Sequence, residues 1–160
     1  MASFTATKTS EATVAHPREL VWEVLTDPAT IARITPMVRD ITADGDLWHW
    51  QLVRIPVLGK HVELDFTERM DFDPTSRIIF AHAPDGRERA GTDGRYDLTD
   101  AHPEGSTHLR MELSVTVDLP FPGIARPAVQ ASMHGVLTAM GSGFAHGIEK
   151  ELRARAARRR

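Results

Sequence analysis

The sequence predicts an α+β fold in which a strongly curved, seven-stranded antiparallel sheet wraps around one long C-terminal helix. Segments that alternate apolar and polar residues follow one another along most of the chain, and links rich in Gly, Pro and Asp join them. One long segment, 127–157, has apolar residues at three- and four-residue spacing, which is typical of an amphipathic helix. A sheet with one apolar face needs a cover, and this helix supplies it.

One strand and two short helices are expected before the main run of strands. Residues 4–14 are rich in Thr, which favours a strand. A helix is expected over 16–28, because a proline suits its first turn and an Asp-Pro pair ends it. A second short helix, 29–36, stops before its final proline. The six remaining strands are expected at 38–43, 47–55, 61–72, 77–83, 93–99 and 107–119.

The segment "HVELDFTERMDF", 61–72, holds a charged residue in an otherwise apolar row. Side chains alternate between the two faces of a strand, so Glu68 falls between Phe66 and Met70 on the apolar side. Three interpretations are open. The carboxylate lies at a bulge or at the mouth of the sheet and meets water, it orients a bound molecule, or it acts as a general acid or base.

The length of the chain indicates a single domain, and its charge argues against a nucleic-acid-binding protein. The 160 residues fit one domain, expected at 1–152, followed by a basic tail at 153–160 that holds five of the 19 Lys and Arg residues. The net charge is −3, and the 22 acidic residues against the other 14 basic ones give the body a charge of −8. An acidic body argues against a nucleic-acid partner. The tail is expected to be a solvated helix end.

The absence of long apolar runs and of cysteine bears on the compartment. No stretch approaches the roughly 20 apolar residues that span a bilayer, and the first residues lack the apolar run of a signal peptide. With no cysteine, disulfides and thiolate metal sites are excluded. We therefore expect a cytoplasmic protein without stable membrane insertion, and the oligomeric state stays open.

A strongly twisted sheet offers more concave area than one helix can fill, so a cavity is expected between them. Its polar groups are expected to be Glu68, His82, Arg54 and Tyr96, which would orient an otherwise apolar ligand. Glu68, His82 and Tyr96 are also the catalytic candidates. The full set of expected ligand-binding residues is Trp48, Trp50, Leu52, Arg54, Leu64, Phe66, Glu68, Met70, Phe80, His82, Tyr96, Met111, Leu113, Met133, His134, Leu137 and Met140.

Searches for local motifs lead to the expectation of no metal and no cofactor. The eight histidines show no HExxH pair or other i, i+4 ligand spacing. The glycine-rich stretch "GSGFAHG", 141–147, falls inside the predicted long helix instead of after a strand, so it does not indicate a phosphate loop. No G-x-S-x-G nucleophile elbow is present.

The order of elements and three segments resemble the START-like (SRPBCC) superfamily, and more narrowly bacterial polyketide cyclase/dehydrase and lipid-transport proteins. The signature after the first strand consists here of Ala15, Pro17, Val21, Trp22, Leu25, Asp27 and Pro28. The stretches "GRYDLTD", 94–100, and "SVTVDLPFPG", 114–123, are similar to the closing strands of that group. The resemblance implies a helix-grip fold, and it implies no single function, because lipid carriers, hormone receptors, cyclases and co-chaperones share this fold.

Three functions follow as hypotheses. The first is binding of a hydrophobic small molecule, such as a lipid, a quinone, a polyketide or a polycyclic metabolite, in the cavity. The alternative is an enzyme of the polyketide cyclase or dehydratase type that uses Glu68 and His82 as acid and base. The third is a structural adaptor whose core is filled by its own side chains.

Overall fold

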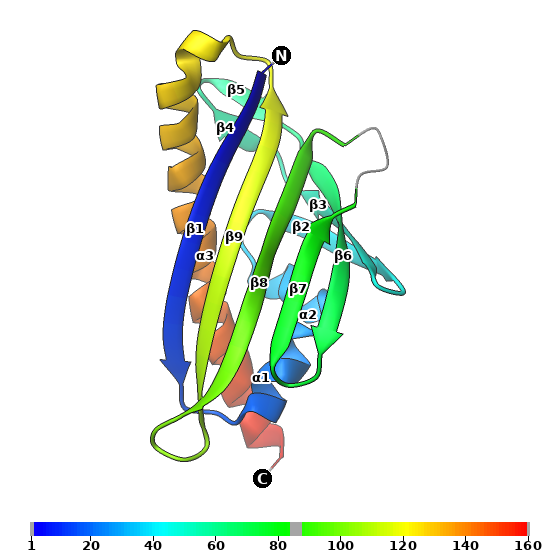
Figure 1. Ribbon diagram of the computed structural model, residues 1–160, viewed down its shortest axis with the longest axis vertical. Coiled ribbons are helices and arrows are strands. Elements are labelled where there is room, and N and C mark those ends of the chain that lie inside the picture. Colours follow the sequence, from blue (N-terminus) through cyan, green and yellow to red (C-terminus); the bar gives the residue numbers. More distant parts are fainter. Residues whose placement is uncertain (1, 84–87, 160) are drawn as a thin grey trace.

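A computed structural model describes residues 2–83 and 88–159. It has two layers, a curved antiparallel sheet and a long helix that lies along its concave side (Figure 1). The sheet has seven strands in the order β1-β9-β8-β7-β6-β3-β2. The strands are β1 (Ala2–Val14), β2 (Val38–Asp44), β3 (Leu47–Leu52), β4 (Ile55–Val57), β5 (Lys60–Val62), β6 (Asp65–Asp73), β7 (Arg77–His82), β8 (Ala90–Ala101) and β9 (Ser106–Leu119). The helices are α1 (Arg18–Leu25), α2 (Pro28–Ile34), the 3-10 turn η1 (Gly123–Ala125) and α3 (Arg126–Arg158).

The predicted fold class is confirmed, including the two short helices between the first and second strands. The apolar stripe of α1 is buried, and it packs in one core cluster with the C-terminal half of α3 through Ile148 and Leu152. A second cluster joins Phe4, Val129 and Met133 at the opposite end of α3. The space between sheet and helix therefore has packed apolar ends.

Two glycines of α3 allow a close approach to the last residue of α2 and to the turn that follows it. A Cβ added at Gly143 would lie 2.2 Å from Pro36 Cγ, and one at Gly147 would lie 2.8 Å from Ile34 Cβ. Any larger residue would push the end of α2 away from α3. Glycine has a lower helix propensity than alanine, by about 1 kcal/mol at each position, but it allows the close contacts with Pro36 and Ile34.

The expected strands 47–55 and 61–72 are each interrupted, which corrects the predicted bounds of both. β3 ends at Leu52, and β4 and β5 form a separate two-stranded sheet around a turn at Leu58 and Gly59, both of which have positive φ. β6 then starts at Asp65. The small β4–β5 hairpin buries Ile55 and Val57 against the second core cluster, so it covers one end of the main sheet.

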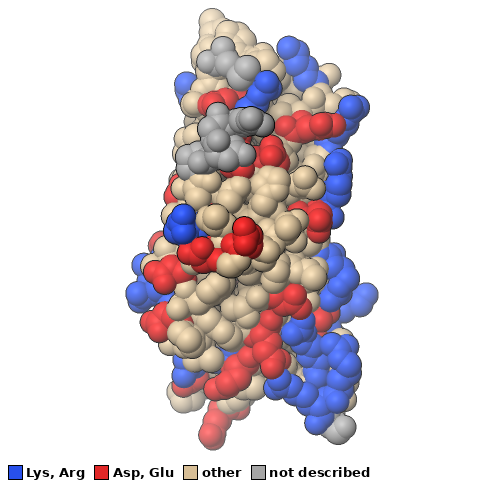
Figure 2. Space-filling model, turned by 90° about the vertical axis from the view of Figure 1, so that its right-hand side faces the viewer, with Lys and Arg blue, Asp and Glu red and all other residues tan. Residues whose placement is uncertain are grey.

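Residues 153–158 continue α3, and acidic partners hold part of this basic segment. Arg155 lies 3.0 Å from Glu151 and 3.1 Å from Asp27, and Arg159 pairs with Glu23. Figure 2 shows basic side chains gathered at the lower end of the molecule, where Figure 1 places the end of α3. Within the described ranges, none of the helices combines the length and the apolar character that a bilayer span requires.

Candidate functional site

A cavity of about 180 Å³ lies between the concave face of the sheet and α3. Its wall is mostly apolar, with contributions from both core clusters and from α3. Fourteen of the predicted residues line it: Trp48, Trp50, Leu52, Leu64, Phe66, Glu68, Met70, Phe80, Tyr96, Met111, Leu113, Met133, Leu137 and Met140. The interior between sheet and helix is therefore not filled by side chains.

Further lining residues were missed by the sequence analysis, although part of the signal was present. Ala90, Thr92, Val115, Val117 and Leu119 continue the inward rows of β8 and β9, and Val136 and Phe144 belong to the apolar stripe of α3. The others come from segments whose direction no local pattern predicts, namely Lys8, Leu25, Ile31, Thr35, Ile55, Val57 and Gly141.

Among the residues that the structure describes, Glu68 is the only acidic side chain that lines the cavity. It lies in the middle of β6, opposite Trp48 of β3 and His82 of β7, and the register is unbroken there. The residue is only 4% exposed, so of the three interpretations the one that places it at a bulge or at the mouth of the sheet, in contact with water, is wrong. Because the strand register is unbroken, Glu68 faces the cavity together with Phe66 and Met70, its neighbours in the apolar row.

The surroundings of Glu68 favour its neutral form. Burial raises the pKa of this carboxyl to about 7, while the hydroxyl of Thr92, which donates a hydrogen bond to Oε2, opposes the rise. The indole of Trp50 opposes it too, although its Nε1–H has no hydrogen-bond partner among the described residues. No Lys or Arg in the described chain forms an ion pair with Glu68.

Tyr96 adds a second proton donor to the same wall. Its ring lies 5.7 Å from that of Phe80, centroid to centroid, and both line the cavity. Burial raises the pKa of the phenol well above its usual value, and the nearby negative charge of Glu68 adds to the rise. The hydroxyl thus stays protonated at neutral pH. Chemically, the cavity offers one carboxyl that titrates near neutrality and one phenol hydroxyl that stays protonated, while the ammonium group of Lys8, at the wall, donates to the Thr138 hydroxyl at 3.3 Å.

Arg54 and His134 do not line the cavity, and both expectations are corrected. Arg54 follows the end of β3, where the alternation of strand side chains stops, and its side chain is 70% exposed with a 2.9 Å ion pair to Glu63. His134 lies on the exposed face of α3, one position after the buried Met133. Neither side chain is placed to contact a molecule in the cavity.

His82 is also absent from the cavity wall, although alternation along β7 predicts that it points inward. It is the last residue of β7, and its ring packs where a Cβ of Gly91 would stand, 2.4 Å from Nδ1. Gly91 alternates with the inward residues Ala90 and Thr92, so the imidazole lies toward the outer face of the sheet. The proposed acid–base pair of Glu68 and His82 is therefore separated by the sheet.

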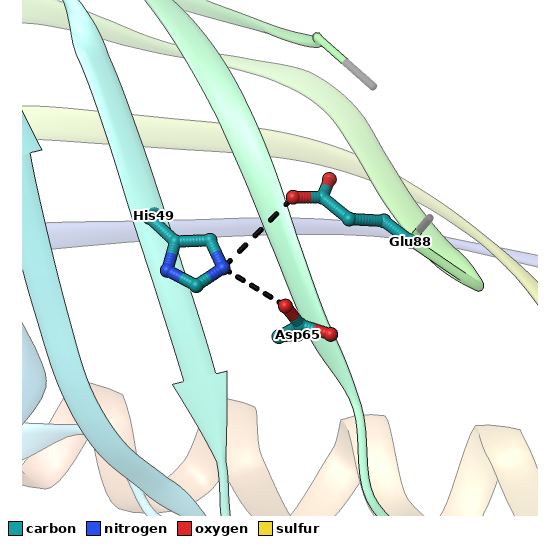
Figure 3. A group of neighbouring side chains, drawn as sticks. All are labelled: His49, Asp65 and Glu88. Carbon is teal, nitrogen blue, oxygen red and sulfur yellow. Dashed lines mark hydrogen bonds and ion pairs between the residues drawn. The ribbon is translucent and has the colours of Figure 1, made fainter. Parts of the chain in front are cut away.

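On that outer face, His49, Asp65 and Glu88 come together, and we call these three residues the outer cluster (Figure 3). His82 lies beside them, with Nε2 3.7 Å from Glu88 Oε1. No local motif predicts this group, because its members come from three segments with no characteristic spacing.

Comparison with known proteins identifies the fold. The model is similar to the Zhui aromatase/cyclase from Streptomyces sp. R1128, with a TM-score of 0.71 and 18% identity over 95% of this chain and 96% of that one. A conserved protein from Geobacillus kaustophilus gives a TM-score of 0.71 and 21% identity over 93% and 96% of the two chains. A START superfamily protein from Mycobacterium smegmatis gives 0.62 and 19% identity over 94% and 97%.

No protein-family model and no curated protein sequence matches this chain. At these low identities, the solved structures establish the START-like helix-grip fold, which the sequence resemblance implied, and they establish no activity.

Proposed function

We propose that this protein binds a neutral, hydrophobic small molecule in the cavity between the sheet and α3. The observation that carries the proposal is an unfilled, mostly apolar hollow in which Glu68, the one acidic lining residue in the described part of the chain, is buried. Removal of apolar ligand surface from water contributes roughly 25 cal/mol per Å² before the costs of association.

The size of the hollow limits the ligand. An engineered apolar cavity of about 150 Å³ in another protein binds benzene, and the present one measures about 180 Å³. It suits a molecule of one or two fused rings as it stands. Larger lipids, quinones or polyketides require displacement of wall side chains, and Met70, Met111, Met133 and Met140 are flexible enough to move.

Glu68 and Tyr96 favour a ligand without a negative charge. A carboxyl with a pKa of about 7 and a phenol with a raised pKa both donate hydrogen bonds to a neutral carbonyl or hydroxyl oxygen. A ligand carboxylate would meet a second negative charge in a dry site at pH above 7, which is unfavourable. The preferred ligand is therefore apolar with one neutral oxygen.

Titration calorimetry with naphthalene, 2-naphthol and 1-naphthoate at pH 7.5 tests the proposal. We expect 2-naphthol to bind most tightly and 1-naphthoate most weakly. Leu113→Trp fills the cavity and should weaken 2-naphthol at least about tenfold, roughly 1.4 kcal/mol. Ile79→Trp places the same residue on the outer face, where Ile79 is exposed, and should leave the affinity unchanged. Equal affinities in both variants would contradict binding in this cavity.

Catalysis is a second candidate, and the near-neutral pKa of Glu68 beside the Tyr96 hydroxyl favours it. In a cyclase or dehydratase reaction, the Glu68 carboxylate would remove a proton α to a carbonyl while Tyr96 donates to the carbonyl oxygen. The Zhui protein of similar fold is an aromatase/cyclase. A short poly-β-ketone incubated with the protein should then lose water, as followed by mass spectrometry. Glu68→Gln should stop this reaction and change the affinity for 2-naphthol little, whereas a pure carrier shows no turnover with either chain.

A further inference from the structure

The outer cluster places three ligand-type atoms at one point of the convex face. His49 Nε2 lies 3.0 Å from Asp65 Oδ2 and 3.9 Å from Glu88 Oε2. One donor atom from each of the three residues lies within 4.8 Å of the other two. In Figure 3 the three side chains converge from β3, β6 and the segment that precedes β8.

The strand register and a side-chain anchor hold this arrangement. His49 of β3 stands opposite Thr67 of β6, and Asp65 lies two residues before Thr67 on the same outer row. Glu88 precedes β8 but reaches across to β6, where it accepts hydrogen bonds from the backbone N–H and the hydroxyl of Thr67, at 2.8 and 2.6 Å. The carboxylate position is therefore fixed from two directions.

The burial of the Glu88 side chain also indicates that this carboxylate needs a cation beside it. Its side chain is only 1% exposed, and within residues 2–83 and 88–159 no Lys or Arg pairs with it. Among the described residues, the groups that carry or can carry positive charge and contact Glu88 are the imidazoles of His49 and His82. The buried Nε2 of His82 has no hydrogen-bond partner in the described chain. Buried carboxylates are usually paired with cations or coordinate metals.

We propose that His49, Asp65 and Glu88 bind one divalent transition-metal ion, for which zinc is the suitable probe. One imidazole and two carboxylates form a mixed nitrogen and oxygen donor set that zinc accepts, with three protein ligands and one open position. Ligand atoms at about 2.0–2.2 Å from a tetrahedral zinc ion stand about 3.3 Å apart. The two His49 separations of 3.0 and 3.9 Å bracket that value, and the remaining pair must approach by rotation of exposed Asp65.

The ion would act on the fold and not in the cavity. It would join β3, β6 and the start of β8 on the face opposite Glu68, so the sheet separates it from any ligand in the hollow. His82, with Nε2 3.7 Å from Glu88, is placed to orient that carboxylate. The site would thus stabilise the part of the sheet that carries Glu68.

Calorimetry of the tag-free chain, stripped of metal with EDTA and dialysed, tests this site with zinc chloride. We expect one equivalent of zinc to bind with a Kd of about 10 μM or lower. His49→Ala and Asp65→Asn should each weaken binding at least about tenfold, as expected for loss of a ligand. His108→Ala is the matched control, because His108 lies 3.7 Å from Glu11 on β1 with only that one carboxylate beside it and outside the cluster. It should bind zinc like the wild type.

The change in Tm on addition of zinc is a second test, and it also shows whether each variant is folded. Zinc at 100 times its Kd should raise the Tm of the wild type by about 5 °C or more, and that of Asp65→Asn by much less. Asp65→Asn is preferred to changes at Glu88, because the Asp65 side chain is exposed, whereas the Glu88 carboxylate also accepts two hydrogen bonds from Thr67. Absence of saturable zinc binding, or equal binding in wild type and both ligand variants, would overturn the proposal.

Discussion

Glu68 and Glu88 are both buried against β6, the first on the concave face and the second on the outer face. Glu68 receives one hydroxyl hydrogen bond, from Thr92, and faces an apolar hollow. Glu88 receives two hydrogen bonds from Thr67 and lies beside two imidazoles. Thr67, which holds Glu88 on the outer face, is thus the direct neighbour on β6 of Glu68, which faces the cavity, and the two carboxyls lie in different environments.

This difference shows that burial alone does not decide what a carboxyl does. On the concave face, desolvation dominates and raises the pKa of Glu68 to about 7, so the group becomes a proton donor near neutrality. On the outer face, donors and imidazoles surround the carboxylate, an arrangement suited to an anion or a metal ligand. Removal of each charge should therefore change stability in opposite directions.

The largest effect is expected from Glu88→Ala. Its loss leaves the Thr67 N–H and hydroxyl without their acceptor, and each unsatisfied donor costs about 1–3 kcal/mol. We expect the free energy of unfolding to fall by about 3 kcal/mol, measured by urea denaturation in EDTA. Glu63→Ala, at an exposed carboxylate, is the control and should leave the midpoint in place. An unchanged urea midpoint for Glu88→Ala would contradict the view that Glu88, unlike Glu68, stabilises the fold through its hydrogen bonds.

Glu68→Gln should have the opposite effect, and only at high pH. The folded pKa of about 7 lies above the ordinary value of 4.5, so the folded state holds its proton more tightly than the unfolded state. The resulting stability is fully present below pH 4.5 and is lost as the pH rises through 7. At pH 8 the variant, which has no charge to bury, should be more stable than the wild type by about 3 kcal/mol. Urea curves at pH 5 and pH 8 measure this, and a difference that is the same at both pH values would refute it.

A smaller change is expected from Thr92→Val, which keeps the shape of the side chain and removes the hydroxyl donor to Glu68. Since this hydrogen bond lowers the pKa of Glu68, its loss should move the pKa higher. The midpoint of the pH-dependent stability loss should therefore shift upward. Thr116→Val, on an exposed position of β9, is the comparison and should leave that midpoint alone. A downward shift in Thr92→Val would show that the hydroxyl does not stabilise the carboxylate.

The smallest effect belongs to the exposed pair of Arg54 and Glu63, whose side chains are 70% and 64% exposed. Solvent screens such a pair, so Arg54→Ala should not change the Tm measurably. The pKa of Glu63, which the hydrogen bond from Arg54 holds below its usual value, should rise toward that value in an NMR titration. A clear fall in Tm would mean that this loop contributes more to the sheet than its exposure indicates.

Much of the cavity could be read from local patterns. The alternation along 66–72 and 107–119 correctly placed Phe66, Glu68 and Met111 on the concave wall, because a period of two holds wherever the strand continues. The predictions for Arg54 and His82 failed at strand ends, where that period stops. His134 failed for another reason, since one residue on a helix turns the side chain away from the apolar stripe.

By itself, then, the order of apolar and polar residues determined the curved sheet, its covering helix and which rows face inward, since these depend on side-chain periods within each element. Only the tertiary structure decided where strands stop, how the small β4–β5 hairpin covers one end, and that Glu88 reaches across to His49 and Asp65. Those outcomes depend on register and loop paths that join distant segments, and no local spacing encodes them.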